Sequence, residues 1–356
     1  MKKILVISNM YPSTKDPFYG TFVENFIMDL KKNIPNDRVD MCTIKGRSYN
    51  LLTRIRKYIV FYLLIIFRLL FNNYDLVYVH IITHAVLPLK FISLFKELPL
   101  VFNIHGEDLI TQTRLSSYFL KEAIPLLKKS QLIVVPSFFF KDKVKELLPM
   151  IPISKVFVSA SGGVKDFFFN DDEKEKHECL KIGYVSRIDR GKGWDTFIKA
   201  VKLLENAGVQ SEVIIAGRGL EIGEMNDLLQ KLELKNVSYI GPVEYKDLPK
   251  VYSSLDLFVF PTKLEESLGL VGLEAMACHT PVIGSCIGGL TDYIEDGKNG
   301  FFFEVDNEKS LADKILLYIN KSEEEKKIMQ HNAYEKALCY ESDVVSRNLF
   351  KKLELI

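Results

Sequence analysis

The chain has 356 residues, with 47 Lys and Arg against 46 Asp and Glu, and 47% of its residues are hydrophobic. This length suggests two domains that can each bury a full core, and the composition excludes an intrinsically disordered chain. The five cysteines are scattered and show no C-x-x-C spacing. They argue against a disulfide scaffold and a zinc ribbon, and they fit a reducing compartment.

Charge is distributed unevenly along the chain. Residues 1–165 hold 23 Lys and Arg and 12 Asp and Glu, a net charge of +11, whereas residues 166–356 hold 24 and 34, a net charge of −10. A split of this size predicts an anionic partner for the first half, such as a membrane surface or a phosphorylated substrate. The alternative is that charge varies between domains without functional meaning.

Short continuous apolar runs recur along the chain, separated by stretches with a helical pattern. The first run follows Met1 and two lysines but stops at Ser8, which is too early for a signal peptide, so it predicts a β-strand. Continuous apolar strands alternating with helices predict an α/β fold with two doubly wound, Rossmann-like parallel sheets. The runs cover residues 4–7, 76–79, 100–104, 132–135, 182–185, 213–216, 237–240, 257–260, 281–283 and 301–303.

The pattern also predicts helices and domain boundaries. Residues 194–206 show an apolar stripe at helical spacing, with Gly208 just past its end. A small-residue turn at 159–163 and a polar stretch at 170–178 place the change of domain near residues 160–180. We therefore predict a first domain over residues 1–165 and a second over residues 166–339.

Residues 58–67 form an apolar and aromatic run that is preceded by Arg54, Arg56 and Lys57 and followed by Arg68. A membrane-spanning helix needs about 20 apolar residues, so this run is too short to cross a bilayer. It fits either an interfacial helix with basic residues near lipid phosphates or a helix buried against the sheet. We expect most of its surface to pack in the core and its basic N-terminal flank to face a membrane.

The densest chemical signal lies between residues 260 and 289. Glu266 falls in a polar loop after a strand, and Glu274 falls one turn inside the helix that follows. A carboxylate accepts the paired hydroxyls of a sugar or ribose, and the free N–H groups of a helix N-terminus bind phosphate. The N–H groups at this helix start belong to Leu268, Gly269 and Leu270.

This stretch resembles the E-x7-E signature, with its A-M-A-x-G-x-P-V continuation, of glycosyltransferase family 4. That family comprises retaining, nucleotide-sugar-dependent glycosyltransferases with the GT-B fold; His279 stands where the family has a glycine. Residues 183–193 resemble the family's G-R-L-x-x-x-K-G loop, and residues 104–108 resemble its H-G-x-D motif. Residues 215–219 resemble the family's next strand end, and weaker matches at residues 10–12 and 20–22 extend the resemblance over nearly the whole chain.

The resemblance implies a role for each matched residue. Arg187 and Lys192 would bind the donor diphosphate, Glu274 the ribose hydroxyls and Glu266 the transferred sugar. His105 of the first domain would approach the reacting centre, although a lone histidine at a strand end is more often structural. The remaining positions are Leu268, Gly269, Leu270 and Gly217 on the donor side, and Gly20, Asp108 and His84 on the acceptor side. Asp108 could equally cap a helix, and Gly20 could merely form a turn.

The resemblance further implies a mechanism and partners. The acceptor would attack the front face of the sugar, and the leaving phosphate would help to deprotonate it. The sequence has no D-x-D motif, so we expect no metal and a UDP- or GDP-type nucleotide sugar as co-substrate. The acceptor would be a glycan, which we expect to be lipid-linked, used in capsule, O-antigen or exopolysaccharide synthesis. The protein would be cytoplasmic and peripheral at the inner face of the cell membrane, with a C-terminal helix over 340–356 packing on the first domain.

Other functions remain open at this point. A GT-B sugar-nucleotide epimerase, a phosphorylase or a non-catalytic sugar-nucleotide-binding subunit would share the fold. An NAD-dependent oxidoreductase is disfavoured because Gly217, Gly219 and Gly223 do not have the dinucleotide-binding spacing. Nucleic-acid binding would explain a basic half, but basic and aromatic residues are not interleaved as in known modules.

Overall fold

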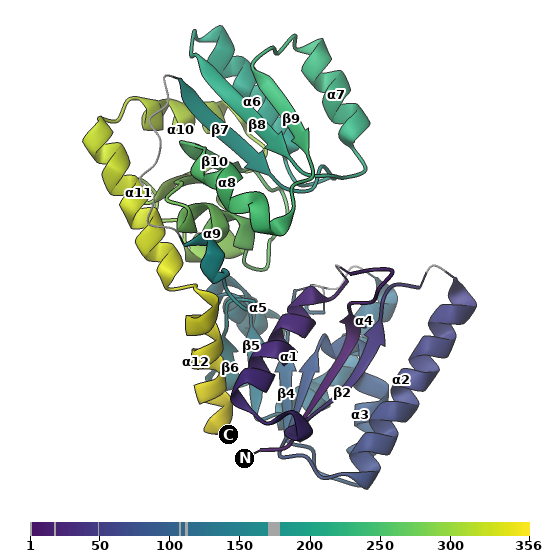
Figure 1. Cartoon of the computed structure of the whole chain (residues 1–356). Coiled ribbons are helices and arrows are strands. Elements are labelled where there is room, and N and C mark those ends of the chain that lie inside the picture. Colours follow the sequence, from purple (N-terminus) through teal and green to yellow (C-terminus); the bar gives the residue numbers. More distant parts are fainter. Residues whose placement is uncertain (1, 18, 49, 107, 111–112, 170–178) are drawn as a thin grey trace. The chain divides into compact units, whose positions relative to one another are not determined.

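A computed structural model describes residues 2–17, 19–48, 50–106, 108–110, 113–169 and 179–356. The chain divides into two compact units, and the first consists of Met1–Gly162 together with Ser346–Ile356. The second unit is Gly163–Val345. Each unit contains a parallel six-stranded sheet with helices between successive strands (Figure 1). The predicted doubly wound α/β class is confirmed in both.

The first sheet has the strand order β2-β1-β3-β4-β5-β6. Its strands are β1 (Ile4–Tyr11), β2 (Val39–Lys45), β3 (Leu76–His80), β4 (Leu100–Asn103), β5 (Leu132–Val135) and β6 (Val156–Val158). Its helices are α1 (Thr21–Asn33), α2 (Leu51–Phe71), α3 (Val86–Ile92), α4 (Arg114–Lys129), α5 (Phe138–Leu147) and the greater part of α12 (Ser342–Glu354). The chain runs from β1 to β2 on one side and places β3 on the other, so the direction of winding reverses between β1 and β3.

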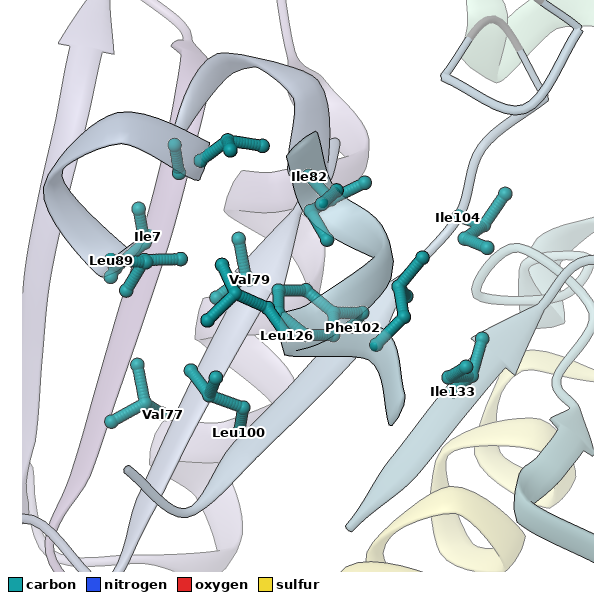
Figure 2. Close-up of a cluster of buried hydrophobic side chains, with 14 of the residues drawn as sticks. Ile7, Val77, Val79, Ile82, Leu89, Leu100, Phe102, Ile104, Leu126 and Ile133 are labelled. Carbon is teal, nitrogen blue, oxygen red and sulfur yellow. The ribbon is translucent and has the colours of Figure 1, made fainter. Parts of the chain in front are cut away.

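Both faces of this sheet are buried, as continuous apolar strands require. On one face, side chains of β1, β3, β4 and β5 pack against α2, α3, α4 and α5. Figure 2 shows the part of this cluster that involves α3 and α4. On the other face, Val6 and Tyr78 lie in a cluster with Val23 of α1 and with Leu349 and Leu353 of α12. The last turns of the chain therefore complete the core of the first unit.

The second sheet has the order β12-β11-β10-β7-β8-β9. Its strands are β7 (Leu180–Val185), β8 (Ser211–Ala216), β9 (Val237–Gly241), β10 (Leu257–Phe260), β11 (Val282–Ser285) and β12 (Gly300–Phe303). Its helices are α6 (Trp194–Asn206), α7 (Ile222–Lys231), α8 (Leu248–Ser253), α9 (Leu270–Ala277), α10 (Glu308–Ile319) and α11 (Glu323–Leu338). Helix α6 has the predicted bounds, and Trp194, Phe197, Ile198, Val201 and Leu204 are all buried.

Two strands, β2 and β6, lie outside the predicted set. Both are edge strands of the first sheet and pair on one side only. Strand β2 mixes polar and apolar residues and is only partly buried, and β6 has three residues. Neither shows the continuous apolar run of a central strand. The polar stretch proposed as a linker, residues 170–178, lies outside the described residues.

Helix α2 differs most from the expectation. It spans 21 residues rather than the predicted ten-residue core, and only Phe61, Ile65 and Leu69 are fully buried. The expectation that most of its surface would pack in the core is wrong, because these three residues occupy a single stripe at a spacing of four. Among the described helices, none is both long and apolar enough to cross a membrane.

Candidate functional site

The predicted donor residues lie where the second sheet reverses its winding. The chain runs from β7 to β8 and β9 on one side, whereas β10 lies on the other side of β7. In open α/β sheets, ligands bind at the carboxyl ends of the strands at such a switch point. Arg187 and Lys192 follow β7, and Glu266 follows β10, so the fold brings residues from two distant segments to this point.

Lys192 and Glu266 form an ion pair at this switch point. The Nζ atom of Lys192 lies 2.6 Å from Oε1 of Glu266, and the two side chains are only 11% and 18% exposed. The hydroxyl of Thr262 donates to the same carboxylate oxygen at 2.9 Å. Charge-assisted hydrogen bonds of this kind are stronger than neutral ones and fix both groups. The site therefore holds one cation and one carboxylate at a defined position.

Arg187 is the exposed member of the same loop. Its guanidinium lies 3.1 Å from the carboxylate of Asp189, and its side chain is 67% exposed. The hydroxyl of Tyr184 donates to the backbone carbonyl of Arg187 at 2.9 Å, which ties the start of the loop to β7. Because its backbone is held in place and its side chain is exposed, Arg187 can turn its guanidinium toward a bound anion.

Gly217 follows β8 beside this loop. It has a φ of 142°, and a Cβ atom there would lie 1.8 Å from the carbonyl oxygen of Ser186. Only a residue without a side chain permits this approach. Gly217 thus keeps the ends of β7 and β8 close together.

Helix α9 begins as predicted at Leu270. Gly269 occupies the N-cap position with a left-handed φ of 81°, and no described side chain caps this end. The N-terminal N–H groups of a helix carry partial positive charge and favour an anion. Leu268 is buried in the preceding loop, and the backbone N–H of Gly289 donates to the carbonyl of Glu266 at 2.8 Å.

Glu274 is buried inside α9, with 5% exposure. The hydroxyl of Tyr245 donates to one of its carboxylate oxygens at 3.1 Å, and the hydroxyl of Tyr252 to the other at 3.4 Å. Burial raises the pKa of Glu274 from 4.5 to about 7, and the two tyrosine hydroxyls oppose this by stabilising the charged form. The predicted ribose-binding carboxylate is therefore already hydrogen-bonded.

His279 replaces the family's glycine just after α9. Its φ is 57°, in the left-handed region that favours glycine at a helix end. Its ring stacks on that of Tyr334 in α11, with centroids 4.0 Å apart and planes 5° apart. The stack explains how a non-glycine residue is accommodated at this position.

In the first unit, His105 follows β4 and meets His80 at the end of β3. Nδ1 of His80 lies 2.9 Å from Nε2 of His105, and the rings of Phe22 and Phe26 of α1 pack against this pair. Burial lowers the pKa of both imidazoles, that of His105 to about 4. Nε2 of His80 is buried without a hydrogen-bond partner among the described residues.

The other predicted acceptor-side residues also lie in the first unit, and Asp108 contacts the histidine pair directly. Asp108 is buried, and one of its carboxylate oxygens accepts the N–H groups of His105 at 3.0 Å and of Gly106 at 3.1 Å. Asp108 thus braces the turn that holds His105, and the N-cap of the next described helix, α4, is Thr113. Nδ1 of His84 lies 2.7 Å from the hydroxyl of Tyr58 in α2.

Gly20 connects β1 to α1. It has a φ of 77°, and a Cβ atom there would lie 2.7 Å from the backbone of Met10. Gly20 therefore makes the turn considered for it, and it also allows two backbone segments to approach closely.

Sequence reasoning missed the side chains that hold the predicted ones. Thr262 and Tyr245 contact the two glutamates, and Tyr58 contacts His84. Each of these hydroxyl residues lies between 4 and 29 residues along the chain from the residue that it contacts. None of them belongs to a recognisable sequence motif. Within the described ranges, no group of three or more His, Cys, Asp or Glu side chains could hold a metal ion.

Comparison with known proteins identifies the second unit. Residues 166–336 match the family model for glycosyl transferases group 1. An uncharacterized glycosyltransferase of Methanocaldococcus jannaschii, MJ1178, is 27% identical over 262 residues, covering 72% of this chain and 69% of the relative. The capsular polysaccharide biosynthesis glycosyltransferase CapM of Staphylococcus aureus is 31% identical over 192 residues, covering 52% and 48%.

A solved structure supports the same conclusion for the fold. HepE of Anabaena, crystallised with UDP, aligns with a TM-score of 0.77 at 19% identity, covering 99% of this chain and all of HepE. This likeness confirms the GT-B fold. The chain is a glycosyltransferase enzyme, and its residues 166–336 are similar to the glycosyl transferases of group 1.

Proposed function

We propose that the protein is a family 4 glycosyltransferase that moves a sugar from a nucleotide diphosphate to a glycan acceptor with retention of anomeric configuration. The observation that carries this proposal is the meeting of Lys192, Glu266 and the N-terminus of α9 at the switch point of the second unit. HepE, which has the same fold, was solved with UDP and with UDP-glucose. That supports a UDP-type donor.

The donor diphosphate would bind between positive groups. Lys192 and Arg187 supply cations, and the N–H groups of Leu268, Gly269 and Leu270 supply the helix end. Glu266 would accept hydroxyl groups of the transferred sugar once Lys192 has turned from it to the diphosphate. Glu274 would accept the ribose hydroxyls in exchange for the hydroxyl of Tyr245. We propose that this binding needs no metal.

If the anomeric configuration is retained without a protein nucleophile, the protein has two roles, which are to position the reactants and to stabilise charge. Front-face attack requires the acceptor hydroxyl and the leaving phosphate to lie on the same side of the sugar, so the residues must hold both in position. Negative charge grows on the departing diphosphate as its bond to the sugar breaks. Lys192, Arg187 and the positive end of α9 are fixed groups that stabilise this charge, and the phosphate takes the acceptor's proton.

We assign the acceptor to the first unit. His105, with its neutral imidazole held by His80 and by the turn around Asp108, would contact the sugar and the acceptor hydroxyl. Gly20 and His84 would line the acceptor side. Because CapM functions in capsular polysaccharide biosynthesis, we propose a cell-surface glycan, lipid-linked at the cytoplasmic face of the membrane, as the acceptor.

Calorimetry with UDP, GDP and their sugars tests the donor site. We expect one nucleoside diphosphate to bind, and Lys192→Ala to weaken its affinity about ten- to a hundredfold, as expected for losing hydrogen bonds to a charged group of about 1.5–3 kcal/mol. Lys250→Ala is the matched control, because Lys250 is an 85% exposed lysine of the same unit. Unchanged affinity in Lys192→Ala would contradict the donor site, and an inverted product would contradict retention.

A further inference from the structure

The surface of α2 that faces away from the core is apolar and exposed to solvent, and no described element packs on it. Ten large apolar side chains of this helix are each at least 44% exposed. They lie on the side of the helix away from the core, whereas Phe61, Ile65 and Leu69 are buried and Tyr58, Tyr62 and Ile66 are partly buried against it. We call them the α2 face, and they are Leu51, Leu52, Ile55, Ile59, Val60, Leu63, Leu64, Phe67, Leu70 and Phe71.

The apolar surface continues beyond α2. Leu94 and Phe95, which follow α3, are 73% and 70% exposed. The ammonium group of the next residue, Lys96, donates to the backbone carbonyls of Leu69 and Asn72 at the end of α2, at 3.2 and 3.0 Å. This contact places Leu94 and Phe95 beside the C-terminal end of the α2 face. Soluble monomers rarely expose continuous apolar patches of more than a few hundred Å², and larger ones mark interaction sites.

The charged residues of α2 itself all have the same sign. Helix α2 contains Arg54, Arg56, Lys57 and Arg68 and no acidic residue. Arg54 and Arg56 are exposed, whereas Lys57 donates to backbone carbonyls of residues 45–47.

The acidic groups nearest this surface are few. Asp40 pairs with Arg68, and Glu122 pairs with Lys90 of α3. Glu97 is exposed next to Lys96. The basic groups near the N-terminal end of the helix are therefore not neutralised by acidic neighbours of α2.

We propose that α2 lies flat on an anionic lipid bilayer, with the α2 face, Leu94 and Phe95 inserted among the acyl chains and Arg54 and Arg56 bound to lipid phosphates. A helix of 21 residues is about 30 Å long, so it offers an extended surface in the membrane plane. An apolar face bordered by basic residues is the pattern of an interfacial helix.

Charge favours lipid over a second copy of this chain. Two copies paired through their α2 faces would bring Arg54 and Arg56 close to the same arginines in a parallel arrangement, or close to Arg68 and Lys96 in an antiparallel one. Like charges that face one another destabilise an interface. An anionic headgroup layer instead provides opposite charge along the whole helix.

The other side of the same helix contacts the acceptor side of the first unit. Tyr58 of α2 is bonded to His84 at 2.7 Å. A lipid-linked acceptor at the membrane would therefore lie close to the acceptor-side residues of the first unit. This step rests on the proposed function. The membrane contact itself depends only on the α2 face.

Vesicle co-sedimentation of the full chain tests the proposal. We expect binding to phosphatidylglycerol-containing vesicles, weaker binding to pure phosphatidylcholine, and weaker binding in high salt. Replacing both Leu63 and Phe67 with Asp should reduce binding at least about tenfold. Replacing Arg54 and Arg56 with Ser should reduce it about 25-fold, because each basic residue near the surface contributes about fivefold.

Leu220→Asp is the matched control, since Leu220 is a 93% exposed leucine of the second unit. It should bind vesicles like the parent protein. A second readout uses Leu63→Trp, whose emission should shift to shorter wavelength and be quenched by brominated lipid chains. Leu220→Trp should show neither effect. The native Trp194 is buried in the second unit and gives a constant background.

Three results would overturn the proposal. They are no binding to anionic vesicles, equal binding by the Leu63/Phe67 variant and the Leu220 control, or a dimer in light scattering that the Leu63/Phe67 variant converts to monomer. Nucleotide affinity separates this proposal from the donor site, because the variants of the α2 face should retain it. A protein that binds vesicles but no nucleotide would support the membrane contact and contradict the proposed function.

Discussion

The buried carboxyl group of Glu274 gives the second unit a pH-dependent stability that can be measured without ligand. Burial raises its pKa from 4.5 to about 7, so between these values the folded chain binds more protons at this group than the unfolded chain does. The contribution of Glu274 to stability therefore falls as the pH rises from 4.5 to 7. Below 4.5 the penalty is absent, and above 7 it is fully present.

The magnitude follows from the two pKa values. The difference between 4.5 and about 7 corresponds to about 3 kcal/mol. Glu274→Gln keeps the shape of the side chain and stays neutral at every pH, and a tyrosine hydroxyl can accept a hydrogen bond from its amide. We expect this variant to be more stable than the parent by up to about 3 kcal/mol near pH 8 and about equal to it near pH 4.5.

Urea unfolding followed by tryptophan fluorescence measures the difference in the free energy of unfolding between Glu274→Gln and the parent, and it reports on the second unit alone. Trp194 is the only tryptophan in the chain and lies in α6 of the second unit, where its indole N–H donates to Glu221 at 2.8 Å. Tyr245→Phe is the companion variant. It removes a hydrogen bond that stabilises the carboxylate and should steepen the loss of stability with pH. A stability difference between the parent and Glu274→Gln that is the same at low and high pH would refute the reasoning.

Two further predictions concern histidines. Because burial lowers the pKa of His105 to about 4, its ring should remain neutral from pH 5 upward. An NMR titration, with His105→Gln to assign the signal, should show the transition of His105 near pH 4, and a midpoint near pH 6.5 would contradict this. His279→Gly should change the free energy of unfolding by less than about 1 kcal/mol, because relief of a left-handed residue at about 1–2 kcal/mol offsets loss of the Tyr334 stack at about 0.5–1.5 kcal/mol. A loss above about 2 kcal/mol in urea unfolding would show that the stack dominates.

Most of the strands predicted from the sequence are buried on both faces, although the edge strands β9 and β12 of the second sheet were predicted as well. A central parallel strand such as β3 is apolar at nearly every position because helices cover both of its sides. The two missed strands give weaker signals, because β2 mixes polar and apolar residues and β6 has only three residues. Local pattern therefore predicts continuous apolar strands and misses a mixed or very short one.

For the candidate site, spacing predicted which residues gather but not what they bond. Lys192 and Glu266 are 74 residues apart, and only the strand order places β7 next to β10 and brings the two side chains to 2.6 Å. Helix α2 shows the opposite problem. A helix that is apolar all round is usually buried, and its sequence alone does not reveal that most of this apolar surface faces solvent.

Both glutamates of the proposed donor site are engaged before any ligand arrives, and their partners differ in charge. Glu274 holds two neutral hydroxyls, which ribose hydroxyls replace with groups of the same kind. Glu266 holds the ammonium group of Lys192 in a part-buried pair, and taking either partner away leaves a poorly solvated charge. An uncharged sugar cannot compensate Lys192, whereas a diphosphate can. It follows that, in the proposed site, the nucleotide diphosphate rather than the sugar must supply the binding energy that frees Glu266 for the sugar hydroxyls.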